Sequence, residues 1–172
     1  RALVSPSAAR SLASAAGLGM LLCAVALVAH VPTPLPAWYE THHHTQPVDH
    51  FNFENNATFA ERYLVNRTWW AGPPAPIIFY TGAEGDGVDT IFPHSGPVVE
   101  LARSLGALLV FAEMRFFGTS MPFGEWPSME LTADRLGLLS IEQALADYAA
   151  LIVALRAQHG ADASPVICIG GS

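Results

Sequence analysis

The amino-acid sequence predicts an α/β fold with a mostly parallel sheet and covering helices. Three short apolar runs alternate with two helical patterns between residues 76 and 172. A strand, helix, strand, helix, strand order implies parallel pairing, with the helices on the faces of the sheet. A glycine-rich loop follows the first apolar run, and Gly-Gly-Ser follows the third. We therefore expect both glycine segments at the carboxyl edge of one sheet, where such folds bind ligands.

Residues 1–31 have the pattern of a targeting segment. Arg1 and Arg10 are the charged residues of this segment, and residues 12–31 are largely apolar. A basic start followed by an apolar run is typical of a secretory signal peptide. The run also approaches the length of about 20 residues that crosses a bilayer. We expect either a signal peptide or an uncleaved signal anchor, and we expect membrane contact only through such an anchor.

Residues 32–45 predict a linker rich in proline and histidine. Prolines stiffen its first half, and His42-His43-His44 stands in its second half. No spaced cysteine or carboxylate completes a ligand set with this triplet, so we predict no metal site. Residues 46–172 are the predicted domain. They are expected to begin with edge-type antiparallel strands at residues 51–53 and 59–65.

Local signals predict each later element in turn. Residues 77–80 and 107–112 read as buried strands by their continuous apolar character. Residues 97–105 predict a helix with Pro97 in its first turn and Gly106 as its stop. Pro165 opens the third strand, in which we expect Cys168 to be a small buried residue.

A long helix is predicted before the third strand. Ser140 and Gln143 form a capping box at its start, and His159-Gly160 closes it. Its apolar residues fall on one face, which we expect to cover the sheet. The members of this face are Ile141, Ala144, Leu145, Tyr148, Ile152 and Leu155.

Composition excludes several classes of function. The formal charge is −7, from 15 acidic and 8 basic side chains, which argues against nucleic acid as a partner. The glycine-rich loop at residues 82–87 fits neither a dinucleotide nor a P-loop pattern, and Glu84, Asp86 and Asp89 would repel a phosphate. We predict no cofactor.

Two acceptor sequences, Asn56-Ala57-Thr58 and Asn66-Arg67-Thr68, predict N-glycosylation and a secretory route.

The third strand and the Gly-Gly-Ser after it are half of a nucleophile elbow, a strand-to-turn motif that lifts a serine hydroxyl above a sheet. We predict that Ser172 is a catalytic nucleophile. Gly82 and Ala83 are the candidates for the backbone donors of an oxyanion hole, and Glu84 for binding a cationic group such as a peptide amino terminus. A plain surface turn is the alternative for this loop. Glu113 and Arg115 are interpreted as structural anchors.

Five segments carry a resemblance to a known family: Phe79-Tyr80-Thr81-Gly82, residues 109–113, residues 118–124, residues 142–148 and residues 165–172. Together they resemble the family of lysosomal Pro-X carboxypeptidase, dipeptidyl peptidase II and thymus-specific serine protease, peptidase family S28. The resemblance covers about residue 46 to the end. It implies the N-terminal part of an α/β-hydrolase fold, truncated at the nucleophile elbow, and cleavage of short peptides near proline or alanine.

The resemblance also implies what lies around Ser172. It places the triad Asp and His beyond residue 172, so we expect the chain by itself to be inactive. We also expect it to be unstable, because its last strand lacks the neighbours that a buried parallel strand requires. The family often has Asn at Ala83, His at Met114, Tyr at Phe116 or Phe117 and Glu at Thr119, which leaves carboxypeptidase or dipeptidyl peptidase action open. Peptides are the expected partners, in a lysosome, a vacuole or outside the cell. An esterase or lipase, or a non-catalytic secreted or membrane-anchored remnant, are the alternatives.

Overall fold

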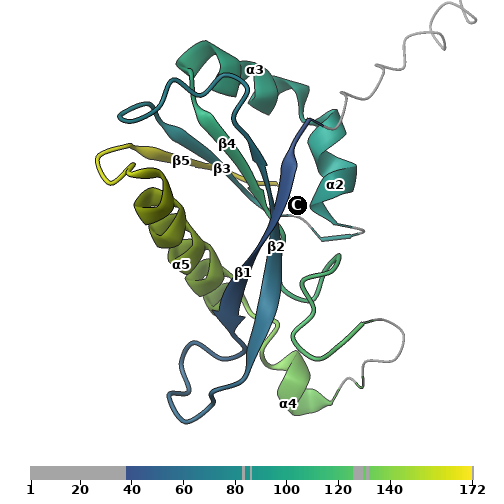
Figure 1. Ribbon diagram of the computed structural model, residues 1–172. Helices are drawn as coiled ribbons and strands as arrows, with labels where there is room; N and C mark the ends of the chain where they lie inside the picture. Colours follow the sequence, from purple (N-terminus) through teal and green to yellow (C-terminus); the bar gives the residue numbers. More distant parts are fainter. Residues whose placement is uncertain (1–37, 83, 86, 126–129, 131, 172) are drawn as a thin grey trace, which may run out of the picture. The chain divides into compact units, whose positions relative to one another are not determined.

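Five strands form one mixed sheet in the order β1-β2-β4-β3-β5 (Figure 1). The computed structural model describes residues 38–82, 84–85, 87–125, 130 and 132–171. These residues lie in one unit, Leu35–Ser172, and the predicted leader lies outside them. The strands are β1 (Glu40–Pro47), β2 (Thr58–Asn66), β3 (Ile77–Thr81), β4 (Leu108–Ala112) and β5 (Val166–Ile169).

The three strands predicted from apolar runs are parallel, as expected. Residues Ile77 to Thr81 of β3 pair with Leu108 to Ala112 of β4, and the other edge of β3 pairs with β5. The sheet as a whole is mixed because β1 and β2 form an antiparallel hairpin that joins it along β4. The α/β class is confirmed. The antiparallel strand expected at residues 59–65 is confirmed as β2, although it lies between β1 and β4 and not at the edge of the sheet. β1 is the strand that the sequence did not predict.

Helices cover both faces of the sheet, as Figure 1 shows. One face carries α5 (Ile141–His159), whose residues Ala144, Tyr148 and Leu151 pack on inward residues of β2, β3 and β4. The other face carries α2 (Val88–Ile91), the 3-10 helix η1 (Phe92–His94) and α3 (Gly96–Leu105). The short helix α4 (Ala133–Leu136) precedes α5.

The buried strands are apolar on both sides because each side contacts a helix layer. In β3, Phe79 belongs to the core under α5, and Ile78 to the core under α2 and α3. All five residues of β4, the central strand of the described sheet, are buried. This is the burial that a continuous apolar run predicts for a parallel strand.

The predicted helix ends are confirmed, but only the Ser140 half of the capping box forms, because the Gln143 side chain bonds to Asp49 and His50 instead. Gly106 has φ 58° at the end of α3, and its N–H donates to the carbonyls of Ala102 and Arg103. At the start of α5 the Ser140 hydroxyl accepts from the Gln143 N–H at 3.3 Å, and Gly160 ends the helix with φ 60°. Caps act through local hydrogen bonds, so their residues can be recognised in the sequence.

The predicted buried face of α5 is partly wrong. Ile141 and Leu145 are 72% and 59% exposed, whereas Gln143 and Asp147 are buried beside Ala144 and Tyr148. The helix turns these polar residues inward because both have buried or part-buried partners. Asp147 pairs with the buried Arg115. The Gln143 side-chain amide donates to Asp49 and accepts from the His50 N–H, both in the segment between β1 and β2.

Two further expectations near the start of the domain are wrong. Residues 40–45, predicted to be part of a linker, belong to β1, where His42 and His44 lie half-buried and His42 stacks on Tyr63. Residues 51–53, predicted to be a strand, form turns in which Phe51 and Phe53 are exposed. The Asn52 carboxamide accepts from the Glu54 N–H, a turn contact that replaces strand pairing.

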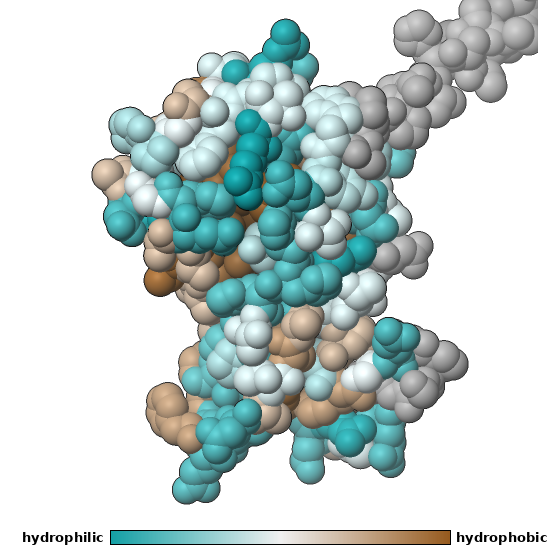
Figure 2. All heavy atoms as spheres, in the orientation of Figure 1, coloured by the Kyte–Doolittle hydropathy of each residue, from teal (hydrophilic) through white to brown (hydrophobic). Residues whose placement is uncertain are grey.

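The surface of the described unit has apolar areas as well as polar ones. Cys168 is exposed in β5, contrary to the expectation that it is buried. Figure 2 shows polar side chains over the middle of the visible face, apolar ones at its left edge, and both kinds in its lower part. Exposed apolar residues of the turns and helices around the hairpin include Phe51, Phe53, Leu136, Leu139, Ile141 and Leu145. Across the described ranges, no helix is long and apolar enough to span a bilayer.

A buried carboxyl group lies between the hairpin and α5. Glu61 is fully buried on β2, and its Oε2 accepts from Gln46 Nε2 at 2.6 Å, whereas Oε1 has no partner among the described residues. Burial raises the pKa of Glu61 from 4.5 to about 8. Gln46 and the charge of Arg115 lower it, and Asp147 and Glu113 raise it. Glu61 therefore keeps its proton at neutral pH.

We predict that Glu61 makes stability depend on pH. Its pKa is raised on folding, so its contribution is full below pH 4.5, falls as the pH rises and is gone above about 8. Glu61→Gln should flatten the fall of the melting temperature between about pH 5 and about pH 8.5 in the complete gene product, because an amide does not ionise in this range. The exposed Glu54→Gln is the control. Parallel pH curves for wild type and Glu61→Gln would contradict this assignment.

Candidate active site

The carboxyl ends of β3, β4 and β5 meet at one edge of the sheet. Thr81 pairs with Ala112 at the end of β4, and Tyr80 pairs with Ile169 at the end of β5. The Thr81 hydroxyl also donates to the Ile169 carbonyl at 3.4 Å. The segments beginning at residues 82, 113 and 170 therefore leave the sheet side by side, as the sequence predicts for the first and third of them.

Two glycines allow these segments to pack closely. Gly82 is buried with φ 60°, and a Cβ there would lie 2.6 Å from Tyr148 Oη and 2.9 Å from the Met114 nitrogen. A Cβ on Gly170 would collide with the Thr81 hydroxyl. Any larger residue would push the first loop away from β4, or β5 away from β3.

The loop after β4 folds around the carboxylate of Glu113. This fully buried side chain pairs with Arg62 of β2 and accepts from the Val88 N–H at 3.3 Å. It also accepts from the backbone N–H groups of Thr119 at 2.9 Å and Ser120 at 3.0 Å, and from both hydroxyls. One carboxylate thus joins β2, the start of α2 and the loop after β4. The interpretation of Glu113 as a structural anchor is confirmed.

Backbone geometry adapts to this carboxylate. Gly118 has φ 55°, and a Cβ there would collide with the Glu113 carboxylate; a Cβ on Gly87 would lie 2.7 Å from Glu113 Oε1. Phe116 has φ 67° although it is not a glycine, and it is almost fully buried. A bulky residue in this region is strained by about 1–3 kcal/mol, and such strain is found where a loop is held for function.

Arg115 forms a second, separate anchor. Its guanidinium is buried and makes two bonds to the Asp147 carboxylate of α5, at 2.6 and 2.8 Å. His50 bonds to the same carboxylate at 2.8 Å, and Arg115 also donates to the carbonyls of Val48 and Leu138. Glu113 and Arg115, although two residues apart, do not pair with each other. The sequence pointed to both of them, but not to Arg62, Asp147 or Glu61.

The predicted site residues fall into two groups. Gly82 lies at the carboxyl edge of β3, and Glu84 is exposed in the loop that follows. Gly170 and Gly171 extend beyond β5 at the same edge. Ser172 and Ala83 lie outside the described residues. The structure thus brings together the segments that begin at Gly82 and at Gly170. These segments are the part of the predicted site that lies within the described residues.

The two glycosylation sequences differ in exposure. Asn56 is exposed in the irregular segment just before β2. Asn66 at the end of β2 is 2% exposed, and its Nδ2, the atom to which a glycan would attach, donates to the Trp38 carbonyl at 2.7 Å. This burial argues against a glycan at Asn66 and leaves Asn56 as the accessible acceptor.

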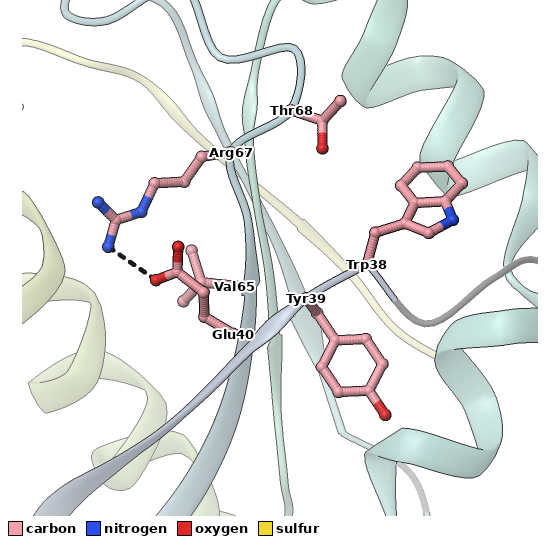
Figure 3. A pocket seen from close by; sticks show the side chains of 6 residues that line it. All are labelled: Trp38, Tyr39, Glu40, Val65, Arg67 and Thr68. Atoms are coloured by element: carbon pink, nitrogen blue, oxygen red, sulfur yellow. Dashed lines mark hydrogen bonds and ion pairs between the residues drawn. The ribbon is translucent and has the colours of Figure 1, made fainter.

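A shallow cleft lies at the other end of the strands. It is lined by Trp38, Tyr39 and Glu40 at the start of the hairpin and by Val65, Arg67 and Thr68 at its end, with an Arg67–Glu40 ion pair of 3.2 Å (Figure 3). Asn66 pairs with Leu109 near the start of β4, so this cleft is at the amino ends of the parallel strands. Ligands of such sheets bind at the carboxyl ends.

Among the described residues, no three His, Cys, Asp or Glu side chains are grouped to hold a metal ion.

Comparison with known proteins defines the class of this chain. The family model described as serine carboxypeptidase S28 matches residues 46–172. The chain therefore belongs to the serine carboxypeptidase S28 family, in agreement with the resemblance seen in the sequence.

Particular relatives are similar over most of the chain. It is 44% identical over 145 residues to lysosomal Pro-X carboxypeptidase of Homo sapiens, covering 82% of this chain and 29% of that protein. It is 36% identical over 163 residues to human thymus-specific serine protease, covering 92% of this chain and 28% of that protein. With prolyl carboxy peptidase like protein 5 of Caenorhabditis elegans the identity is 38% over 136 residues, covering 78% and 26%. The chain spans less than a third of the length of these relatives.

We predict that the Arg115–Asp147 anchor dominates the stability of α5. Asp147→Ala would leave the Arg115 guanidinium buried without its carboxylate, at an expected cost of about 3–5 kcal/mol. Chemical unfolding of the complete gene product measures this loss. Glu100→Ala is the matched control, because Glu100 forms an exposed ion pair with Arg103 at 3.9 Å, and such pairs contribute little. Equal effects of the two substitutions would be inconsistent with this role of Asp147.

Proposed function

We propose that this chain forms part of an α/β-hydrolase that acts as a serine-type exopeptidase, with Ser172 as its nucleophile. One observation carries the proposal: Tyr80 pairs with Ile169 in parallel register, so the segment beginning at Gly82 and the one beginning at Gly170 leave the same edge of the sheet. A nucleophile elbow and the loop that supplies an oxyanion donor need this arrangement. Membership of the S28 family supports the same reading.

In the proposed reaction the Ser172 hydroxyl attacks the carbonyl carbon of the scissile peptide bond. A histidine base takes the hydroxyl proton, and backbone N–H groups at Gly82 or Ala83 stabilise the oxyanion that forms. Collapse of this intermediate breaks the C–N bond, and the amine leaves with the proton. Water then hydrolyses the acyl-enzyme by the same steps. We propose that the histidine and its partner aspartate lie beyond residue 172, as the resemblance to the family implies.

We propose short peptides with proline or alanine beside the cleaved bond as substrates. The name of the relative lysosomal Pro-X carboxypeptidase supports proline. Glu84, two residues after Gly82, is exposed, and its carboxylate is the proposed binding group for a peptide amino terminus, as dipeptidyl peptidase action requires. Carboxypeptidase action would instead require a group that binds the terminal carboxylate. Both modes belong to the proposal, and a lysosome or another secretory compartment is the proposed location.

We predict that Ser172→Ala abolishes peptide hydrolysis by the complete gene product, with a fall in kcat of at least about 10⁴-fold. Assays use short peptides blocked at either end, so that release of an amino-terminal dipeptide and of a carboxyl-terminal residue are told apart. Ser104→Ala, at an exposed hydroxyl on α3, is the control and should retain full activity. Hydrolysis that survives in Ser172→Ala would remove Ser172 as nucleophile, and ester hydrolysis without peptide hydrolysis would favour an esterase.

We also predict that Asn56 carries a glycan and that Asn66 does not. Expression through the secretory route followed by glycosidase treatment and mass spectrometry of the peptides measures both sites. Asn56→Gln should lower the mass by one glycan. Asn66→Gln should leave the glycan mass unchanged, but lower stability, because it disrupts the hydrogen bonds to Trp38 and Thr68. A glycan found on Asn66 would contradict the burial of its side chain.

A further inference from the structure

We propose that Glu113 is a positioning residue for catalysis, which holds the loop at residues 82–87 in the geometry that the oxyanion hole requires. The proposal rests on the proposed function, because the oxyanion hole belongs to that function. In this role Glu113 neither contacts the substrate nor exchanges a proton with it. Its basis is the way in which one buried carboxylate is shared among segments that meet at the carboxyl edge of the sheet.

The loop at residues 82–87 is held at both ends. At its start, Gly82 packs between Tyr148 Oη, the Met114 nitrogen and the Ala112 carbonyl, with no room for a side chain. Just past its end, the Val88 N–H donates to Glu113 Oε1. The two attachments therefore lie at Gly82 and Val88, on either side of the rest of the loop.

The attachment at the end of the loop is reinforced through Arg62. Its Nη2 lies 2.5 Å from Glu113 Oε1 and 2.8 Å from Asp89 Oδ1 in α2. A Cβ on Gly87 would lie 2.5 Å from Arg62 Nη2 and 2.9 Å from Asp89 Oδ1, so Gly87 passes directly over this ion pair. The loop therefore ends beside the guanidinium of Arg62, which Glu113 itself holds in place.

The same carboxylate fixes the neighbouring loop. Its Oε2 accepts from the N–H groups and hydroxyls of Thr119 and Ser120, and the Ser120 hydroxyl accepts from the Arg62 N–H at 2.8 Å. Phe116, with its positive φ, lies within this loop. Glu113 thus sets the distance between the loops after β3 and β4, which would flank a substrate bound at this edge.

An oxyanion donor must be held within a fraction of an ångström, because it acts on charge that develops only in the transition state. Displacement of the loop would therefore lower kcat more than it raises KM. Removal of one oxyanion donor lowers kcat by about 10²–10³-fold. A donor that is present but displaced should lower kcat by a smaller factor. A purely structural anchor would instead lower stability and leave kcat of the folded enzyme unchanged.

The test compares Glu113→Gln with Asp147→Asn in the complete gene product, at a temperature where both are folded. The Gln amide keeps the shape of the side chain but turns an NH₂ toward the donors that converge on it. We expect kcat to fall at least about tenfold in Glu113→Gln, with KM changed less than about twofold. Asp147→Asn weakens an equally buried anchor on the α5 side, and should lower the melting temperature without changing kcat.

A second variant covers the case in which Glu113→Gln fails to fold. Glu113→Asp keeps the charge that pairs with Arg62 but shortens its reach, and should give an intermediate kcat. Unchanged kcat in the folded variants, or a rise in KM alone, would overturn the proposal. Failure of the proposed function gives a different result, since Ser172→Ala would then retain hydrolysis whatever Glu113 does.

Discussion

The pairing of buried charge just after β4 is the interaction on which the rest of the structure depends. Glu113 and Arg115 leave the same strand end, and each is fully buried. An unpaired ion at such a position would be very costly, so each must have partners from other elements. Glu113 takes Arg62 from β2 together with N–H groups from two loops, and Arg115 takes Asp147 from α5. The hairpin, the long helix and both loops are thereby fixed relative to β4.

These pairs explain where the structure departs from its sequence pattern. On α5, periodicity alone favours Ile141 and Leu145 as inward residues, yet the helix turns Gln143 and Asp147 inward to reach Asp49, His50 and Arg115. In the same way, β1 extends into a segment that composition marks as a linker, because pairing with β2 supplies its hydrogen bonds. Composition and periodicity describe a segment by itself and contain no information about a distant partner.

What could be predicted follows from the same distinction. β3, β4, β5, α3 and the ends of α5 depend on local signals, such as apolar runs, capping hydroxyls and glycines, and the sequence located all of them. At the site, the convergence of Gly82 with Gly170 and Gly171 followed from strand order. Arg62 could not have been connected with Glu113, nor Asn66 recognised as buried, since both depend on how the hairpin joins the edge of β4.

Glu61 and Asp147 show that burial does not by itself determine how a carboxyl group behaves. Both are almost fully buried near Arg115. Asp147 accepts two bonds from the guanidinium and one from His50, whereas Glu61 accepts one bond, from the neutral amide of Gln46. With a single neutral donor, burial dominates, and Glu61 retains its proton. The number and charge of the donors thus separate a carboxylate that anchors a helix from a carboxylic acid whose ionisation would weaken the fold as the pH rises.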